Sequence, residues 1–169
     1  MSILTKDEIL KEISSGNVKI EPYNQDNVGP GSVDLTLGNK FRVFEKAMQV
    51  YDVDENLDYK QITKLVEADS IIIQPHETIL GITNEKITLP PNLSGWLEGR
   101  SRFARVGLMV HISASFMQPG ISNHQVLEMT NMGNVPLRLH AGTKICQFVF
   151  ERTEGEAKYE GRYVDQTEL

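Results

Sequence analysis

Short apolar runs separated by polar turn residues dominate the sequence beyond residue 18. Val, Ile, Leu and Phe gather in these runs, and Gly, Pro, Asn or Asp interrupt them at intervals of roughly ten residues. This spacing is typical of an all-β domain. The predicted strands span 18–20, 32–37, 41–44, 49–53, 71–73, 78–83, 86–89, 93–97, 108–112, 125–131, 136–139 and 144–150.

Turn-forming pairs between these runs include Gly38-Asn39, Thr83-Asn84 and Pro119-Gly120. No long amphipathic helix recurs between the strands, which disfavours a parallel βαβ sheet and favours a distorted β-barrel or jelly roll. Segment 54–70 is polar and is expected to form a loop or a short helix. The pattern therefore predicts one all-β domain over residues 1–169.

The two ends of the chain differ from this strand pattern. Thr5 and Glu8 have the spacing of a capping box, so a short N-terminal helix is predicted to begin there and to end at Gly16. Residues 154–169 are polar and poor in apolar side chains, a composition typical of a mobile end or of a lid.

Bulk properties exclude several classes of protein. The single cysteine, Cys146, allows neither an intramolecular disulfide nor a cysteine-rich zinc site. No apolar run is long enough to span a bilayer and no signal pattern begins the chain, so a cytoplasmic protein that does not insert into a membrane is expected. The net charge of −6 argues against a broad surface for nucleic acid or anionic lipid.

The densest cluster of chemically active side chains is the segment 99–105, Gly-Arg-Ser-Arg-Phe-Ala-Arg. Its guanidinium groups, its hydroxyl and the free amides of a turn that leads into one helical turn would suit phosphate oxygens. A solvated surface turn explains the same composition, and the segment alone does not decide between the two.

Glu128 lies in the predicted strand 125–131, where alternation places Leu127 and Met129 on the opposite face from the carboxylate. A carboxylate in such a strand either faces solvent or lies in a pocket, where it is suited to proton transfer. The four histidines are scattered, so surface or packed positions are expected for them. The sequence lacks the His-x-Glu and Pro-Cys-x-x-Cys pattern of zinc deaminases, so any deamination would be zinc-free.

A series of short motifs occurs in a fixed order along the chain: Leu89-Pro90, Gly95-Trp96-Leu97-Glu98-Gly99-Arg100-Ser101, Ala104-Arg105-Val106-Gly107-Leu108, Pro119-Gly120 and Val126-Leu127-Glu128. With support from 31–38 and from the tail 159–166, this series resembles the dCTP deaminase family, within the trimeric dUTPase and dCTP deaminase superfamily. The resemblance implies a dUTPase-like homotrimer with active sites at subunit interfaces. It also implies a deoxynucleoside triphosphate as substrate, Mg²⁺ on the substrate phosphates and a C-terminal lid over residues 154–169.

The resemblance also implies roles for single residues. Glu128 would take a proton from the water that attacks C4 of cytosine, and Ser101 and the Ala114 carbonyl would position that water. The implied phosphate-binding and nucleotide-covering residues are Arg100, Ser101, Arg102, Arg105, Tyr159, Arg162 and Gln166. The products would be dUTP, which supplies dTTP synthesis, and ammonia.

Several positions depart from the family pattern. Arg102 stands where the family has a second serine, and Arg162 replaces a lysine common in the lid. Gln118 replaces the aspartate with which dUTPases and bifunctional members activate water at the α-phosphate, and an amide cannot act as that base. The sequence continues only to Leu169, so a short lid is expected.

Three hypotheses stay open on this basis. The first is a zinc-free dCTP deaminase, which Glu128 favours. The second is a dUTP diphosphatase or a bifunctional enzyme, which Gln118 disfavours. The third is a non-catalytic nucleotide-binding trimer, which the changes at residues 102 and 118 would fit.

Overall fold

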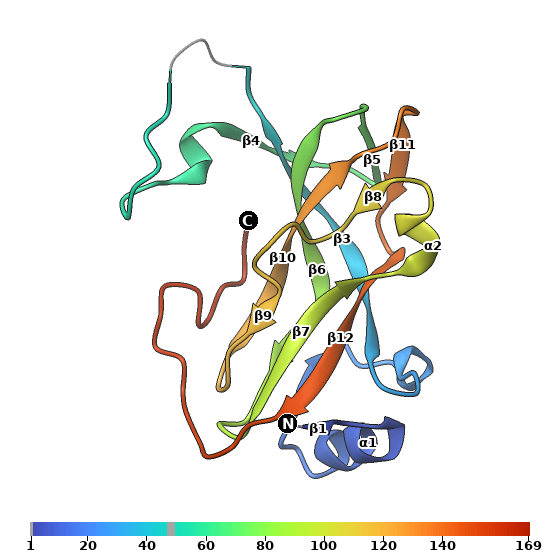
Figure 1. The fold of residues 1–169 in the computed structure, drawn as a ribbon, viewed down its shortest axis with the longest axis vertical. Coiled ribbons are helices and arrows are strands. Elements are labelled where there is room, and N and C mark those ends of the chain that lie inside the picture. Colours follow the sequence, from blue (N-terminus) through green and yellow to red (C-terminus); the bar gives the residue numbers. More distant parts are fainter. Residues whose placement is uncertain (1, 47–49) are drawn as a thin grey trace.

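The computed structural model describes residues 2–46 and 50–169 (Figure 1). Strands form most of it, as the sequence predicts. The elements in chain order are β1 (Ser2–Ile3), α1 (Lys6–Ser14), β2 (Lys19–Glu21), η1 (Gln25–Asn27), β3 (Val33–Phe44), η2 (Tyr59–Gln61), β4 (Thr63–Glu67), β5 (Ser70–Ile73), β6 (Thr78–Thr88), β7 (Leu93–Gly99), α2 (Ser101–Ala104), β8 (Leu108–Met109), β9 (Phe116–Met117), β10 (Ser122–Asn131), β11 (Leu137–His140) and β12 (Lys144–Arg152).

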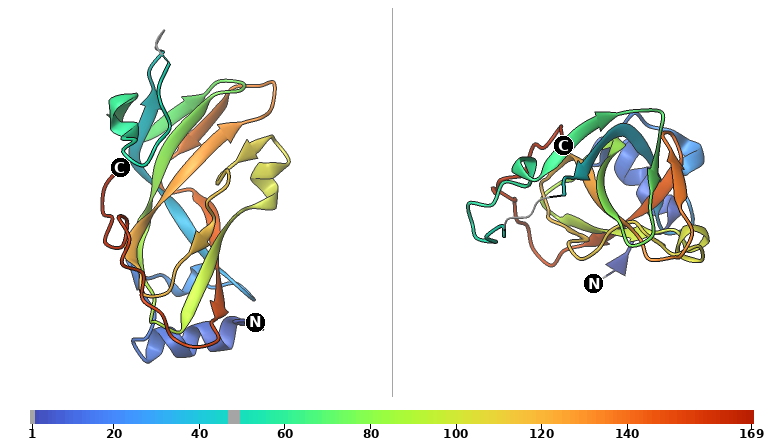
Figure 2. Two further views of the ribbon diagram at one scale, coloured as in Figure 1. Left: turned by 60° about the vertical axis from the view of Figure 1, so that its left-hand side comes forward. Right: turned by 90° about the horizontal axis from the view of Figure 1, so that it is seen from above.

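The described strands form one large antiparallel sheet and a separate β11–β5 pair. The large sheet runs β8-β10-β6-β3-β12-β7-β9, and β1, β2 and β4 pair with β12, β6 and β3. Figure 2 shows this sheet curling around the core as a half-barrel, with α1 at one end. Phe41, Leu127, Phe148 and Phe150 are fully buried inside it. The predicted all-β, distorted-barrel fold is confirmed.

Strands β3 and β6 are each continuous where the sequence pattern predicts two strands joined by a turn. The pairing of β3 with β6 contains a register shift between Leu37 and Phe41, and this irregularity accounts for the polar residues that resemble turns. A Cβ at Gly38 would lie 2.9 Å from the Ile82 carbonyl oxygen, so the glycine permits a close approach of two strands. Asn84 donates to the Leu37 carbonyl at 3.2 Å across the same irregularity.

Residues 50–70 also differ from the expectation. Residue 49 of the predicted strand 49–53 lies outside the described residues, and residues 50–53 form no strand. Within 54–70, η2 is the expected short helical turn, but the edge strand β4 was not predicted. Most of its side chains are polar or exposed, as is typical of an edge strand, and within the described residues β4 pairs with β3 alone.

The N-terminal helix α1 forms as predicted, with Ile9 buried and Gly16 in the left-handed conformation just beyond it (φ 78°). The predicted capping box is wrong in one respect. Thr5 is the N-cap, but its side chain makes no capping hydrogen bond. Among the described residues, no helix is long and apolar enough to cross a membrane.

Candidate functional site

Strand β10 carries Glu128 in the middle of the curled sheet. The predicted alternation is confirmed, since Leu127 and Met129 are fully buried on the opposite face. Glu128 pairs in register with Leu80 of β6, and Leu80 pairs in turn with Arg42 of β3. The Glu128 side chain is 32% exposed, and it lines a cavity rather than an open solvated face.

This cavity has a volume of about 510 Å³ and mostly apolar and aromatic walls. A volume of this size falls in the usual range for small-molecule sites. Its lining residues are Phe44, Tyr59, Leu80, His111, Ala114, Phe116, Met117, Gln118, Ile121, Asn123, His124, Gln125, Val126, Glu128, Tyr159, Tyr163 and Gln166. The aromatic walls suit a flat ring, and the carboxylate of Glu128 supplies the acid–base group.

His111 connects two of the three groups that the family resemblance assigns to the attacking water, the Glu128 carboxylate and the Ala114 carbonyl. Its Nδ1 lies 2.5 Å from Glu128 Oε2, and its Nε2 donates to the Ala114 carbonyl at 2.9 Å. Its side chain is only 5% exposed. Burial lowers the pKa of His111, but the Glu128 carboxylate and the Ala114 carbonyl outweigh burial and raise it above its ordinary value. Because both ring nitrogens face acceptors, the protonated ring fits this position best.

Sequence reasoning did not identify His111, which it treated as a surface or packed histidine. His111 follows the apolar run 108–110, in which Leu108 and Val110 are buried, and a polar residue directly after that run was the available signal. Its partner Glu128 lies on another strand, so the pairing depends on how β8 and β10 are registered.

The tail beyond β12 is docked along β10 rather than extending into solvent. Tyr159 donates from its amide to the Pro119 carbonyl, and the amides of Ser122 and His124 donate to Val164 and Gln166, all at 2.9 Å. Tyr159 and Gln166 therefore line the cavity, as a covering segment would. Arg162 does not line it, and instead donates to the Leu57 carbonyl at 3.4 Å.

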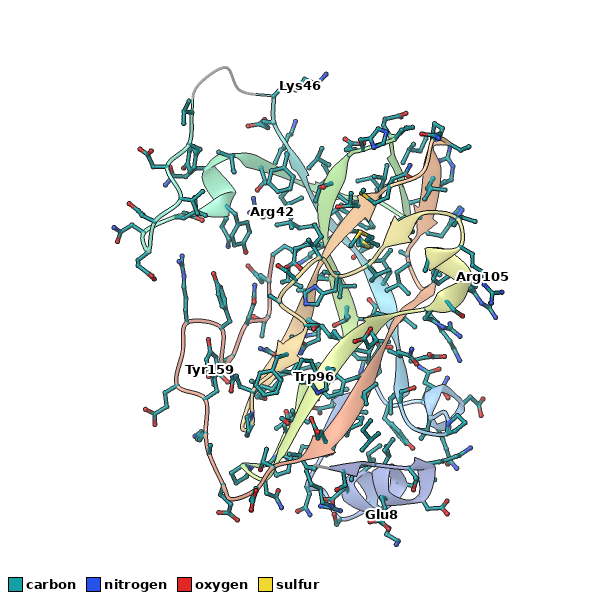
Figure 3. All side chains as sticks on the ribbon, in the orientation of Figure 1. Glu8, Arg42, Lys46, Trp96, Arg105 and Tyr159 are labelled. Atoms are coloured by element: carbon teal, nitrogen blue, oxygen red, sulfur yellow. The ribbon has the colours of Figure 1, made fainter. Side chains whose placement is uncertain are left out.

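The arginine segment lies elsewhere in the chain. Arg100 forms an ion pair with Asp34 at 3.3 Å, while Ser101, Arg102 and Arg105 are exposed on and beside α2. Figure 3 shows Arg105 and Tyr159 on opposite sides of the molecule. The fold of this chain thus gathers the predicted residues Ala114, Glu128, Tyr159 and Gln166, together with Gln118, at the cavity. It leaves Arg100, Ser101, Arg102 and Arg105 away from the cavity.

Residues 2–46 and 50–169 contain no candidate site for a metal ion bound directly by side chains. No group of three or more His, Cys, Asp or Glu side chains is placed there to hold an ion. Cys146 is buried in β12, and burial raises the pKa of its thiol far above the ordinary value.

A half-barrel sheet around a core, with a carboxylate–histidine pair in an aromatic cavity, places the chain in the dUTPase-like fold class. A 2'-deoxycytidine 5'-triphosphate deaminase structure from Agrobacterium tumefaciens shares this fold, with a TM-score of 0.69 and 20% identity over 88% of this chain and 48% of that chain. A mutant dUTPase of Staphylococcus bacteriophage 80alpha, solved with dUpNHpp, has a TM-score of 0.51 at 11% identity over 86% of this chain and 96% of that chain.

The chain belongs to the dCTP deaminase-like family, whose model matches residues 3–153. A "dCTP deaminase, dUMP-forming" of Nocardioides sp. is 38% identical over 97% of this chain and 91% of that protein. A "dCTP deaminase" of Marinomonas sp. is 40% identical over 95% of this chain and 91% of that protein. The family resemblance of the sequence motifs is thereby confirmed.

Proposed function

We propose that this protein catalyses the zinc-free hydrolytic deamination of dCTP to dUTP and ammonia. The observation that carries the proposal is the grouping of Glu128, His111 and the Ala114 carbonyl at one point of an aromatic cavity. The names of the relatives, which denote dCTP deaminases, support the substrate.

In the proposed reaction, Glu128 takes a proton from a water molecule as the water oxygen attacks C4 of cytosine. The carboxyl group passes that proton to N3, which gives a tetrahedral C4 that bears both OH and NH₂. Proton transfer from the OH to the departing amine, through Glu128, releases ammonia and leaves the C4 carbonyl of dUTP. One carboxylate is sufficient for these transfers when the cavity excludes bulk water.

His111 acts in this scheme as a positioning residue. Its ring holds the Glu128 carboxylate on one side and the Ala114 carbonyl on the other, so the two acceptors stay at a fixed separation. A water molecule that donates its protons to two fixed acceptors has a lone pair directed away from both, toward C4 of the cytosine ring. The histidine therefore orients the nucleophile without touching the substrate.

The position of the arginine segment supports a homotrimer with shared active sites. We propose that residues 100–105 of one subunit complete the cavity of a neighbouring subunit, because they lie on the opposite side of their own protomer from the tail. Ser101 would then contact the attacking water, and Arg100, Arg102 and Arg105 would bind the triphosphate. Mg²⁺ would enter on the phosphates as part of the substrate.

The docked tail supports a lid made of residues 154–169. Tyr159 and Gln166 already line the cavity, so both would contact a bound nucleotide. Arg162 bonds to Leu57 near this mouth and would need to turn inward to reach a phosphate.

A dUMP-forming activity is the second candidate, because relatives of this chain carry that name. Gln118 argues for dUTP as the final product. It lines the cavity at the position where the family resemblance expects a catalytic aspartate, and its amide cannot activate water at the α-phosphate. The product therefore separates the two candidates.

The test is to incubate the protein with dCTP, and separately with dUTP, in Mg²⁺ and to measure ammonia and pyrophosphate in the same samples. Ammonia without pyrophosphate is the expected result. Pyrophosphate from dUTP would move the protein to the second candidate, and neither product would indicate a non-catalytic nucleotide-binding trimer. Glu128→Gln should abolish ammonia release while nucleotide binding is retained, and continued turnover in this variant would remove Glu128 from its role.

A further inference from the structure

Residues 159–169, termed the strap, cross the mouth of the cavity. The strap begins at the Tyr159–Pro119 hydrogen bond and then follows β10, where Val164 and Gln166 accept from Ser122 and His124. The Asn123 amide group adds a bond to the Tyr163 carbonyl at 2.7 Å. These contacts attach the strap to one edge of β10.

The strap then passes over the outer face of the sheet to Leu169. Leu169 is 3% exposed and packs with Leu80 and Ile82 of β6, next to Tyr59 and Val126. Among residues 153–169, all of which are described, Leu169 alone is buried. Tyr159, at the start of the strap, packs partly buried against the main core, whereas Thr167 and Glu168 are exposed. Leu169 is therefore the fully buried apolar contact at the far end of the strap from Tyr159.

The site that receives Leu169 adjoins the catalytic carboxylate. Leu80 is the register partner of Glu128, and both line the cavity together with Val126. Tyr59, the fourth side of the site, lies under the Arg42 guanidinium, whose Nη1 donates to the Thr63 carbonyl and hydroxyl at 3.3 and 3.2 Å. The receiving site is thus part of the rigid sheet and of the turn that Arg42 holds against it.

We propose that Leu169 latches the strap closed and so acts as a positioning residue for Tyr163 and Gln166 at the cavity. Its catalytic consequence rests on the function proposed above. The hydrogen bonds of the strap each contribute only a modest net free energy against the backbone entropy lost when the strap is ordered. Burial of Leu169 adds a favourable contribution at the end of the strap that Tyr159 does not hold.

Amide exchange at Ser122 and His124 measures closure directly, because the strap carbonyls are the acceptors of both amides. Leu169→Ala should raise exchange at these amides by about ten- to a hundredfold, the fold-change that corresponds to losing one buried leucine. Leu169→Met should restore most of the protection, since methionine fills a similar volume. Leu65→Ala, at an exposed leucine of β4, is the matched control and should leave both amides unchanged.

The kinetic readout separates a latch from a merely structural residue. If only the closed strap binds nucleotide well, Leu169→Ala should raise KM for dCTP about tenfold, with a smaller change in kcat, because bound nucleotide favours closure. Amides of the buried β12 core should exchange as in the unmodified protein.

Two results would overturn the proposal. Unchanged exchange at Ser122 and His124 in Leu169→Ala would show that the leucine does not hold the strap. Faster exchange with unchanged KM would show that closure does not position the cavity residues. If the unmodified protein released no ammonia from dCTP, the proposed function would fail, while the exchange measurement would still decide whether Leu169 is a latch.

Discussion

Replacing His111 with glutamine or asparagine separates its two contacts. The amide nitrogen of glutamine can reach the position of the ring Nε2, so His111→Gln keeps the bond to the Ala114 carbonyl and loses the contact to Glu128. The amide of asparagine lies near the position of Nδ1, so His111→Asn keeps the contact to Glu128 and loses the bond to Ala114. Both variants remain polar and fit the buried site.

The expected loss of kcat differs between the two variants, because the contact to Glu128 involves a charged group and the bond to the Ala114 carbonyl does not. Glu128 Oε2 and His111 Nδ1 are both buried, and each has no other hydrogen-bond partner among the described residues. An interaction with a charged group contributes about 1.5–3 kcal/mol, and a neutral hydrogen bond about 0.5–1.5 kcal/mol. If these losses appear in the transition state, kcat should fall about 13- to 160-fold in His111→Gln and about 2- to 13-fold in His111→Asn.

The raised pKa of His111 gives this prediction a dependence on pH. Glu128 and the Ala114 carbonyl raise the folded-state pKa against burial, so the ion pair stabilises the fold fully below the ordinary value of 6.5 and is lost as pH rises through the raised value. The Tm difference between the unmodified protein and His111→Gln should therefore be largest below pH 6.5 and should shrink at higher pH.

The assay is thermal unfolding of the three proteins between about pH 5 and 9, with ammonia release from dCTP measured on the same samples. His111→Asn is the control for loss of the ring, because it retains a partner for Glu128. A Tm deficit of the same size at every pH would refute the charged pair. A larger loss of kcat in His111→Asn than in His111→Gln would show that the Ala114 bond, not the Glu128 contact, is the important one.

Three further predictions concern other parts of the molecule. Gln118→Asp should add a general base to the cavity and raise pyrophosphate release from dUTP by about 10²- to 10⁴-fold, with Gln118→Asn as the uncharged control; no increase would show that more than this carboxylate is missing. His76→Gly should stabilise the fold by about 0.5–1 kcal/mol, measured by urea unfolding, because His76 is an exposed non-glycine residue at φ 63°; a loss of stability would mean that its side chain makes a favourable contact. Arg105→Ala should weaken binding of dCTP more than binding of deoxycytidine in calorimetry, and equal effects would make the arginine structural.

Much of the fold follows from local pattern. The alternation in β10 predicts which residues face the core and which face outward, because side chains of a strand alternate strictly. The all-β class follows from the spacing of turns in the same way. The continuity of β3 and β6 could not be predicted from local pattern. Gly38 and Asn84 are residue types common in turns, but here they lie where β3 and β6 pair with a register shift.

The residues of the candidate site also fall into those that the sequence could predict and those that it could not. Glu128, Ala114, Tyr159 and Gln166 could be named from motifs, and the structure brings them to one cavity. His111 could not be assigned, because its contact to Glu128 joins a loop to a strand across the β8–β10 pairing. For the arginine segment, the sequence left a surface turn and a phosphate site open, and only the structure shows that the segment lies away from the cavity of its own chain.

By itself, the sequence determined the strand-rich class, the inward and outward faces of β10 and the family. Those properties depend on the order and alternation of neighbouring residues, and local stereochemistry translates that order directly into structure. Only the tertiary structure decided the His111–Glu128 pair, the burial of Leu169 beside Leu80 and the separation of Arg105 from Tyr159. These contacts join residues that are distant in sequence, and the register and curl of the sheet set which of them meet.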